Sequence, residues 1–214
     1  MASVIDFTIS LDISDILRSL GYANAEKSSH ETMHKIEEIE NEFSNRFQCR
    51  SIYRIVDFSL KNNIELLTKT GCIESPKIVS LSQKAKRLLI GLVTLYNFDK
   101  TECDDLLYGY ILHGIGTAAI GKAVDLLLNR IELETGLHTS LPFSPGYCDW
   151  DMTSGQEFIL DSVDPSVINV NVVPQSFIML PVHTISFVSL MGTEEMDRNP
   201  CHFCNMKKCP TRRR

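Results

Sequence analysis

The residues with the clearest chemical potential lie near the carboxyl terminus. Three thiols fall within nine residues there: Cys201, Cys204 and Cys209. Thiolates that converge at this spacing bind zinc or an iron–sulfur cluster, and both normally have four protein ligands in a closed structural site. The fourth ligand would come from Cys148, His202 or a second subunit. The pattern therefore predicts a metal site, and the alternative is a reduced, solvated tail.

A second segment of interest surrounds the single tryptophan. It reads Ser144-Pro145-Gly146-Tyr147-Cys148-Asp149-Trp150-Asp151. Pro-Gly is typical of a tight turn in which the glycine takes a positive φ, and such a turn exposes backbone groups. The tyrosine and tryptophan rings would suit stacking on a flat or cationic ligand. From the residues alone, a loop with both rings folded back on the core is the commoner outcome.

Other patterns have the wrong spacing or context for catalysis. Gly114, Gly116 and Gly121 imitate a dinucleotide-binding fingerprint, but the third glycine comes one residue late and the preceding segment is predicted to be helical. Close packing of a helix against its neighbour explains such small residues better. His30 and His34 have the spacing of a zinc-binding pair but lie at the polar start of a surface helix. No Walker loop or nucleophile elbow is present, and hydrolase chemistry has no support.

Charge and cysteine usage narrow the class of protein. The net charge is −6, which argues against nucleic acid as a partner, and the basic residues of the last eight positions are typical of a solvated tail. No run of about 18 apolar residues and no signal peptide are recognised, so we expect a cytoplasmic protein without a membrane span. Cysteines in that compartment stay reduced, and Cys49, Cys72 and Cys103 are expected to be small buried residues.

Hydrophobic periodicity places these residues on elements. We expect a short helix at 13–20 ended by Gly21, and an amphipathic helix with an acidic outer face after a capping box at 28–31. Strands are expected at 51–60, at 88–96 and within 167–173 and 177–190, and one or two helices between 101 and 135. The sequence thus predicts an α+β protein with one domain, residues 1–192, and a Cys-rich basic tail, residues 193–214.

The order of several short motifs resembles a known family. Ser144-Pro145-Gly146-Tyr147-x-Asp149-Trp150 is followed by Gln156 and by a Val-Val-x-x-Ser-Phe-x-Met-x-Pro segment ending at Pro181. Leu20-Gly21-Tyr22 and Gly116-Thr117-Ala118 extend the match over residues 10–192. The pattern resembles the activation domain of cobalamin-dependent methionine synthase, and more closely the stand-alone proteins similar to that domain. The resemblance implies a single curved domain with helices around a twisted, mainly antiparallel sheet.

The resemblance also implies a binding site for S-adenosylmethionine. Its residues would be Ser144, Pro145, Gly146, Tyr147, Asp149 and Trp150. The methionine synthase motif has an arginine five residues before its tyrosine, where this chain has Pro142, and no arginine occurs from 131 to 197. His138 or Lys122 would then replace it, or the cofactor would be bound weakly or in another way.

The implied function is reductive reactivation of cobalamin held by a separate corrinoid methyltransferase. The chain would be an activation subunit rather than an enzyme acting alone, with no catalytic acid, base or nucleophile of its own. An electron donor such as flavodoxin or ferredoxin is implied, and this need favours an iron–sulfur cluster over zinc in the tail. Two alternatives are a metal-cluster electron-transfer protein and a corrinoid-protein assembly factor that does not bind S-adenosylmethionine.

Overall fold

A computed structural model describes residues 2–22, 28–43, 47–98 and 105–203, with no side chains for 200 and 201. Its centre is a twisted five-stranded sheet in which every neighbouring pair is antiparallel. The strands, in sheet order, are β1 Ser3–Ile9, β2 Phe47–Asp57, β6 Ala85–Tyr96, β10 Thr184–Gly192 and β7 His138–Thr139. Both faces of β6 are covered, which explains its nearly continuous apolar sequence.

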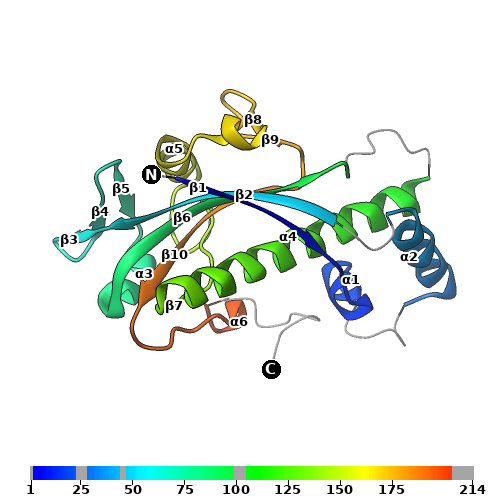
Figure 1. Cartoon of the computed structure of the whole chain (residues 1–214), viewed down its shortest axis with the longest axis horizontal. Helices are drawn as coiled ribbons and strands as arrows, with labels where there is room; N and C mark the ends of the chain where they lie inside the picture. The colour runs from blue at the N-terminus through cyan, green and yellow to red at the C-terminus, as the bar shows by residue number, and fades with distance from the viewer. Residues whose placement is uncertain (1, 23–27, 44–46, 99–104, 204–214) are drawn as a thin grey trace.

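A 30-residue helix, α4 Leu106–Thr135, crosses one face of the sheet (Figure 1). Asp105 begins it by accepting hydrogen bonds from the amides of Leu107 and Tyr108, and Gly136 ends it with a φ of 67°. Two shorter helices, α1 Ile13–Ser19 and α2 His30–Glu42, pack against the same helix. Together these elements bury the first of two core clusters.

The opposite face carries the second core cluster. It is covered by the helices α3 Pro76–Leu81 and α5 Met152–Ser162 and by a small sheet, β3 Ser59–Lys61, β4 Glu65–Leu67 and β5 Cys72–Glu74. A two-stranded hairpin projects beside α5 in Figure 1 and consists of β8 Asn171–Val172 and β9 Met179–Leu180. The remaining short elements are η2 Ser82–Lys84, η3 Pro165–Ile168 and α6 Pro200–Phe203.

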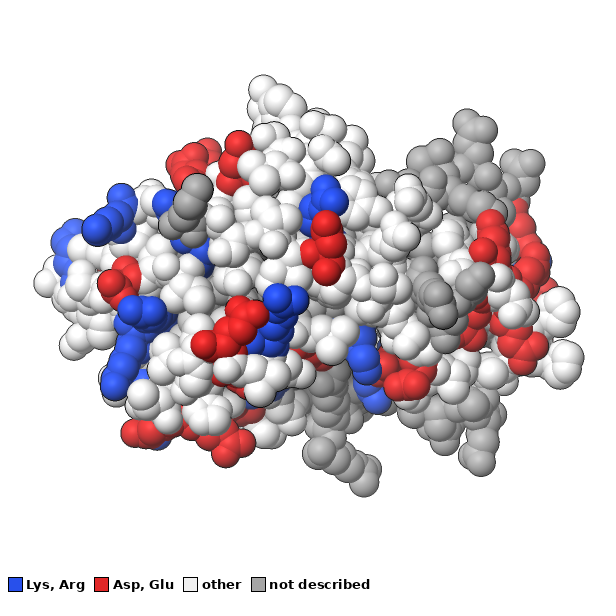
Figure 2. Space-filling view, in the orientation of Figure 1, with Lys and Arg blue, Asp and Glu red and all other residues white. Residues whose placement is uncertain are grey.

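The α+β class and the twisted antiparallel sheet are confirmed, as are the first two helices and the buried strand at 88–96. Ser29 caps α2 by accepting a hydrogen bond from the Thr32 amide, and Figure 2 shows acidic side chains gathered over this helix. Close packing at Gly114 and Gly116 is also confirmed, because a Cβ there would overlap Leu20 or the ring of His183. Residues 105–135 form one helix, and 101–104 lie outside the described residues.

Some predicted strands differ from the structure in position or are absent, and several observed elements were not predicted. β1 and α5 were not predicted, and the strand expected at 51–60 begins at Phe47 and is interrupted at Phe58. The apolar residues at 167–183 form mostly turns, because Pro174 and Pro181 lack amide donors and the β8–β9 pair extends for only two residues on each strand. The predicted boundary after residue 192 coincides with the end of β10, and the described tail lies against the domain up to Phe203.

The helix α4 corrects one expectation about membranes. It is long and apolar enough to cross a bilayer by length and composition, although no such run was expected. In the structure, 61% of its most apolar 18-residue window is buried inside the protein. Packing against the sheet therefore accounts for this composition, and the helix alone is weak evidence for a membrane span.

Candidate functional site

A hollow of about 580 Å³ lies beside α4, and we call it the α4 hollow. Asp15, Arg18 and Ser19 of α1 form one wall. The α4 side contributes residues at helical spacing: Thr117, Ala118, Gly121, Lys122, Val124 and Asp125. The third side consists of Leu141, Pro142, Ile185 and Arg198. Three elements far apart in sequence thus converge on one cavity of a size typical for small-molecule sites.

Charges of both signs line the α4 hollow. Asp15 lies 3.3 Å from the Arg18 guanidinium and 3.8 Å from the Lys122 ammonium, measured between the closest charged atoms. Ala118, Val124, Leu141 and Ile185 contribute apolar side chains to the same lining. A cavity with this lining suits a ligand that carries both charges and an apolar or aromatic portion.

The position of α1 against α4 is fixed by a hydroxyl group. Ser19 Oγ lies 2.7 Å from the carbonyl oxygen of Ile16 and 2.6 Å from that of Gly114. The absence of a side chain at Gly114 allows Leu20 to approach the helix closely. Small residues on α4 therefore position the wall of the hollow, in place of the dinucleotide role that their spacing imitates.

The predicted ligand-binding segment forms a tight loop, residues 144–151. The Gly146 amide donates to the Trp150 carbonyl at 2.9 Å, and Gly146 has a φ of 86° as the Pro-Gly turn requires. Cys148 and Asp149 also adopt positive φ values, of 56° and 58°. Ser144 Oγ donates to the carbonyl of Ser186 on β10. The loop is consequently attached to the edge of the main sheet.

The two rings of the 144–151 loop have opposite environments. Trp150 is 2% exposed and packs edge-on against Phe158, with centroids 6.3 Å apart. A Cβ on Gly155 would lie only 2.8 Å from Trp150 Cε2, so α5 requires glycine there. Tyr147 is 71% exposed. Stacking on a ligand is therefore open to Tyr147 and closed to Trp150 in this conformation.

Other groups of the loop serve the structure around it. Asp151 caps α5 by accepting hydrogen bonds from the amide and hydroxyl of Ser154, which lowers the pKa of its carboxyl group. Asp149 is exposed and Pro145 is buried. Ser144 and the rest of the loop do not line the α4 hollow. Three positions singled out by the resemblance do line the α4 hollow: Thr117, Ala118 and Pro142.

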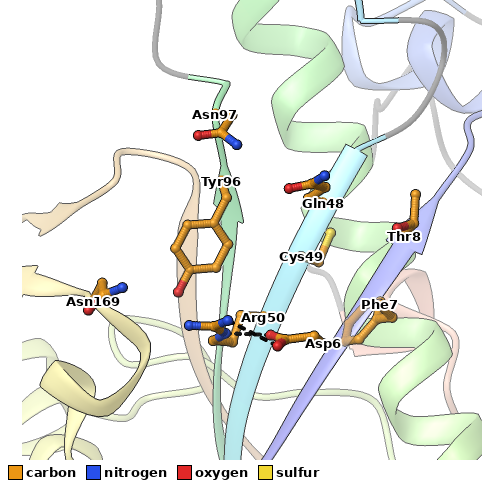
Figure 3. Close-up of a pocket in the computed structure, with 9 residues that line it drawn as sticks. All are labelled: Asp6, Phe7, Thr8, Gln48, Cys49, Arg50, Tyr96, Asn97 and Asn169. Carbon is orange, nitrogen blue, oxygen red and sulfur yellow. Dashed lines mark hydrogen bonds and ion pairs between the residues drawn. The ribbon is translucent and has the colours of Figure 1, made fainter.

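A second hollow, of about 460 Å³, lies on the sheet face away from α4 (Figure 3). Asp6 and Arg50 face each other across β1 and β2 and form an ion pair, which lowers the pKa of the Asp6 carboxyl group. The Arg50 guanidinium lies over the Tyr96 ring, 5.1 Å from its centroid, and the Tyr96 hydroxyl donates to the Ile168 carbonyl. Side chains of Thr8, Gln48, Asn97 and Asn169 complete this polar surface. The sequence analysis did not predict this polar surface, although the polar residues at positions 48 and 50 alternate with buried residues along β2.

The predicted metal ligands cannot be placed. The side chain of Cys201 and all of Cys204 and Cys209 lie outside the described residues. Within the part of the chain that is described, no three potential ligands are grouped for a metal ion. The chain immediately before Cys204 is anchored, since Lys77 donates to the Phe203 carbonyl at 2.7 Å and the rings of Phe143 and Phe203 contact edge-on.

The other described cysteines differ in burial, and the two residues proposed to replace the motif arginine differ in position. Cys49 is buried as expected, and burial raises the pKa of its thiol to about 12. Cys72, which was also expected to be buried, is half-buried on the short strand β5, and Cys103 lies outside the described residues. Cys148 is half-buried and is held near α3 because Ser75 Oγ donates to its carbonyl at 2.6 Å. Lys122 lines the α4 hollow, whereas His138 is exposed on β7.

Comparison with known proteins gives a match among solved structures, and none among family models or curated sequences. No protein-family model matches the chain, and no curated protein sequence matches it. Among solved structures, its fold is similar to the crystal structure of the MetH reactivation domain bound to AdoHcy, with a TM-score of 0.62. The match covers 88% of this chain and 78% of that one at 10% sequence identity. At this identity the likeness shows a shared fold, in agreement with the fold that the sequence motifs imply.

Proposed function

We propose that the chain binds S-adenosylmethionine in the α4 hollow and delivers its methyl group to cobalamin on a separate corrinoid methyltransferase. The observation that carries the proposal is the lining of the hollow. It contains acidic and basic side chains together with an apolar side that includes Pro142. Pro142 is the position at which the methionine synthase motif has its arginine. The shared fold supports the proposal, because the similar reactivation domain was solved with AdoHcy bound.

The ligand and the α4 hollow have matching chemistry. S-adenosylmethionine carries a carboxylate, an ammonium group, a cationic sulfonium and a flat adenine ring. Carboxylates of Asp15 and Asp125 would attract the two cationic groups, while Ala118 and Ile185 provide apolar surface for the ring. A volume of about 580 Å³ lies within the range of small-molecule pockets.

The protein would act by position rather than by acid–base chemistry. In the proposed reaction, an electron from a donor such as flavodoxin or ferredoxin reduces the partner's cob(II)alamin. The methyl group then moves from sulfur to cobalt and leaves S-adenosylhomocysteine. The chain has to hold the sulfonium with its methyl group toward the partner and keep competing nucleophiles away.

The 144–151 loop enters the proposal through Tyr147. Its exposed ring follows Pro142 by five residues and can contact a cation or the partner's corrinoid without disturbing the core. Gly146 and Tyr147 are proposed ligand contacts because the family resemblance implies that role. Trp150 and Asp151 are proposed to hold the loop in place.

The test has a binding arm and a reactivation arm. Calorimetric titration should detect binding of AdoHcy and S-adenosylmethionine, one molecule per chain. A cobalamin-dependent methyltransferase from the same organism, prepared in the cob(II) state with reductant and methyl donor, should regain its methylcobalamin spectrum faster when the chain is added. Absence of binding at millimolar ligand would overturn the proposed site. Binding with an unchanged rate of methylcobalamin formation would overturn the reactivation role.

A further inference from the structure

Arg198 differs from the other cations of the α4 hollow in its bonding. Each of the three cations lies within 4.0 Å of a carboxylate, Arg18 and Lys122 of Asp15 and Arg198 of Glu132. Arg198 Nη1 donates to the amide oxygen of Asn129 at 2.6 Å, and its nearest carboxylate oxygen, on Glu132, is 3.8 Å away. Arg198 Nη2 is buried and makes no hydrogen bond to the described residues. A buried donor without an acceptor is unfavourable, so this atom requires one.

Contacts made by neighbouring residues hold the Arg198 side chain at the wall of the hollow. The carbonyl of Asp197 accepts a hydrogen bond from the Leu141 amide at 3.1 Å, which ties the tail to the segment beside Pro142. Glu132 Oε1 accepts hydrogen bonds from the amide and hydroxyl of Thr139, and Glu132 Oε2 is the oxygen that lies 3.8 Å from Arg198 Nη1. The guanidinium is thereby held at the wall of the hollow with 30% of its side chain exposed.

We infer that Arg198 is the anchor for the ligand's carboxylate, an inference that rests on the proposed S-adenosylmethionine site. A rotation of the partly exposed side chain would bring Nη2 to a carboxylate in the hollow, which would supply the acceptor that Nη2 lacks, and the planar guanidinium can bind both carboxylate oxygens. Pro142 and Arg198 line the same cavity, so the cation comes from the tail rather than from the 144–151 loop. The tail therefore forms part of the binding site.

Decarboxylated S-adenosylmethionine is the matched probe because it keeps the sulfonium, amine and adenosine and lacks only the carboxylate. Calorimetry on the full chain should show S-adenosylmethionine binding roughly 10- to 100-fold more tightly than this probe. In Arg198→Gln the preference should fall to about twofold or less, with the affinity for the probe retained. Arg198→Lys should recover part of the preference.

Arg130→Gln is the charge-matched control, because Arg130 pairs with Glu134 on the exposed side of α4 and does not line the hollow. It should keep the full preference, and thermal unfolding should show all variants folded. Equal loss of both ligands in Arg198→Gln, or an unchanged preference, would overturn the role of Arg198 while leaving the site intact. No binding of either ligand by the unmutated chain would instead overturn the proposed function.

Discussion

The 144–151 loop and the α4 hollow differ in what their polar groups bond to. In the loop, Ser144 and Asp151 are used to attach it to β10 and to cap α5, and the Trp150 ring is buried. In the hollow, charged groups of both signs lie along a cavity wall, and one guanidinium nitrogen has no acceptor among the described residues. Several polar groups of the segment with the most distinctive sequence are thus used within the structure, while the charged groups that line the hollow come from α1, α4 and the tail.

The largest expected effect comes from removing the buried ring. Trp150→Ala should lower the free energy of unfolding by about 3–5 kcal/mol, because it leaves a cavity between the loop and α5. Tyr147→Ala, a neighbouring aromatic truncation at an exposed position, should change it by no more than about 0.5 kcal/mol. Denaturant unfolding compares the two. Similar values for both variants would contradict the division of the loop into one core ring and one surface ring.

Tyr147 also provides the test of whether the loop shares the ligand with the hollow. If its ring contacts the sulfonium, Tyr147→Ala should weaken S-adenosylmethionine binding roughly two- to thirtyfold, the range between an exposed and a desolvated cation–π contact. AdoHcy, which has no sulfonium charge, should lose less. Calorimetry with both ligands decides the matter, and unchanged affinities would restrict the site to the α4 hollow.

The fold was largely predictable, whereas the proposed site was not. Helical periodicity at 13–20 and the continuous apolar run at 88–96 reflect burial that depends mainly on local sequence. The lining of the hollow depends on tertiary contacts, since α1, α4 and Arg198 meet only in the folded chain. Two signals were available: Lys122 and Asp125 lie on one face of the helix, and Arg198 is the next arginine after residue 130. Asp151 ends the segment considered for ligand binding, and its spacing to Ser154 also predicts the helix cap that the structure shows.

The smallest expected effect on ligand binding comes from the tail cysteines. Protein purified without oxygen should contain iron and sulfide, or zinc, at near one site per chain, and Cys204→Ser should lose the metal. The affinity for AdoHcy should stay within about twofold, because Arg198 is held by Asn129 and by the Asp197–Leu141 hydrogen bond. Elemental analysis with calorimetry measures both. If the unmutated protein contains no metal, the tail is a reduced tail without a metal site. If Cys204→Ser also loses AdoHcy binding, the metal contributes to the ligand-binding site.

Two glycines of α4 allow the most direct test of the α4 hollow. A Cβ at Gly109 or at Gly121 would meet no atom within 4 Å, but only Gly121 lines the hollow. Replacing either by leucine should maintain or raise stability by up to about 1 kcal/mol, because glycine is unfavourable within a helix. Calorimetric titration with AdoHcy should show a loss on the order of 100-fold for Gly121→Leu, through steric filling of the cavity, and no loss for Gly109→Leu. Equal AdoHcy affinity in the two folded variants would contradict the α4 hollow as the binding site.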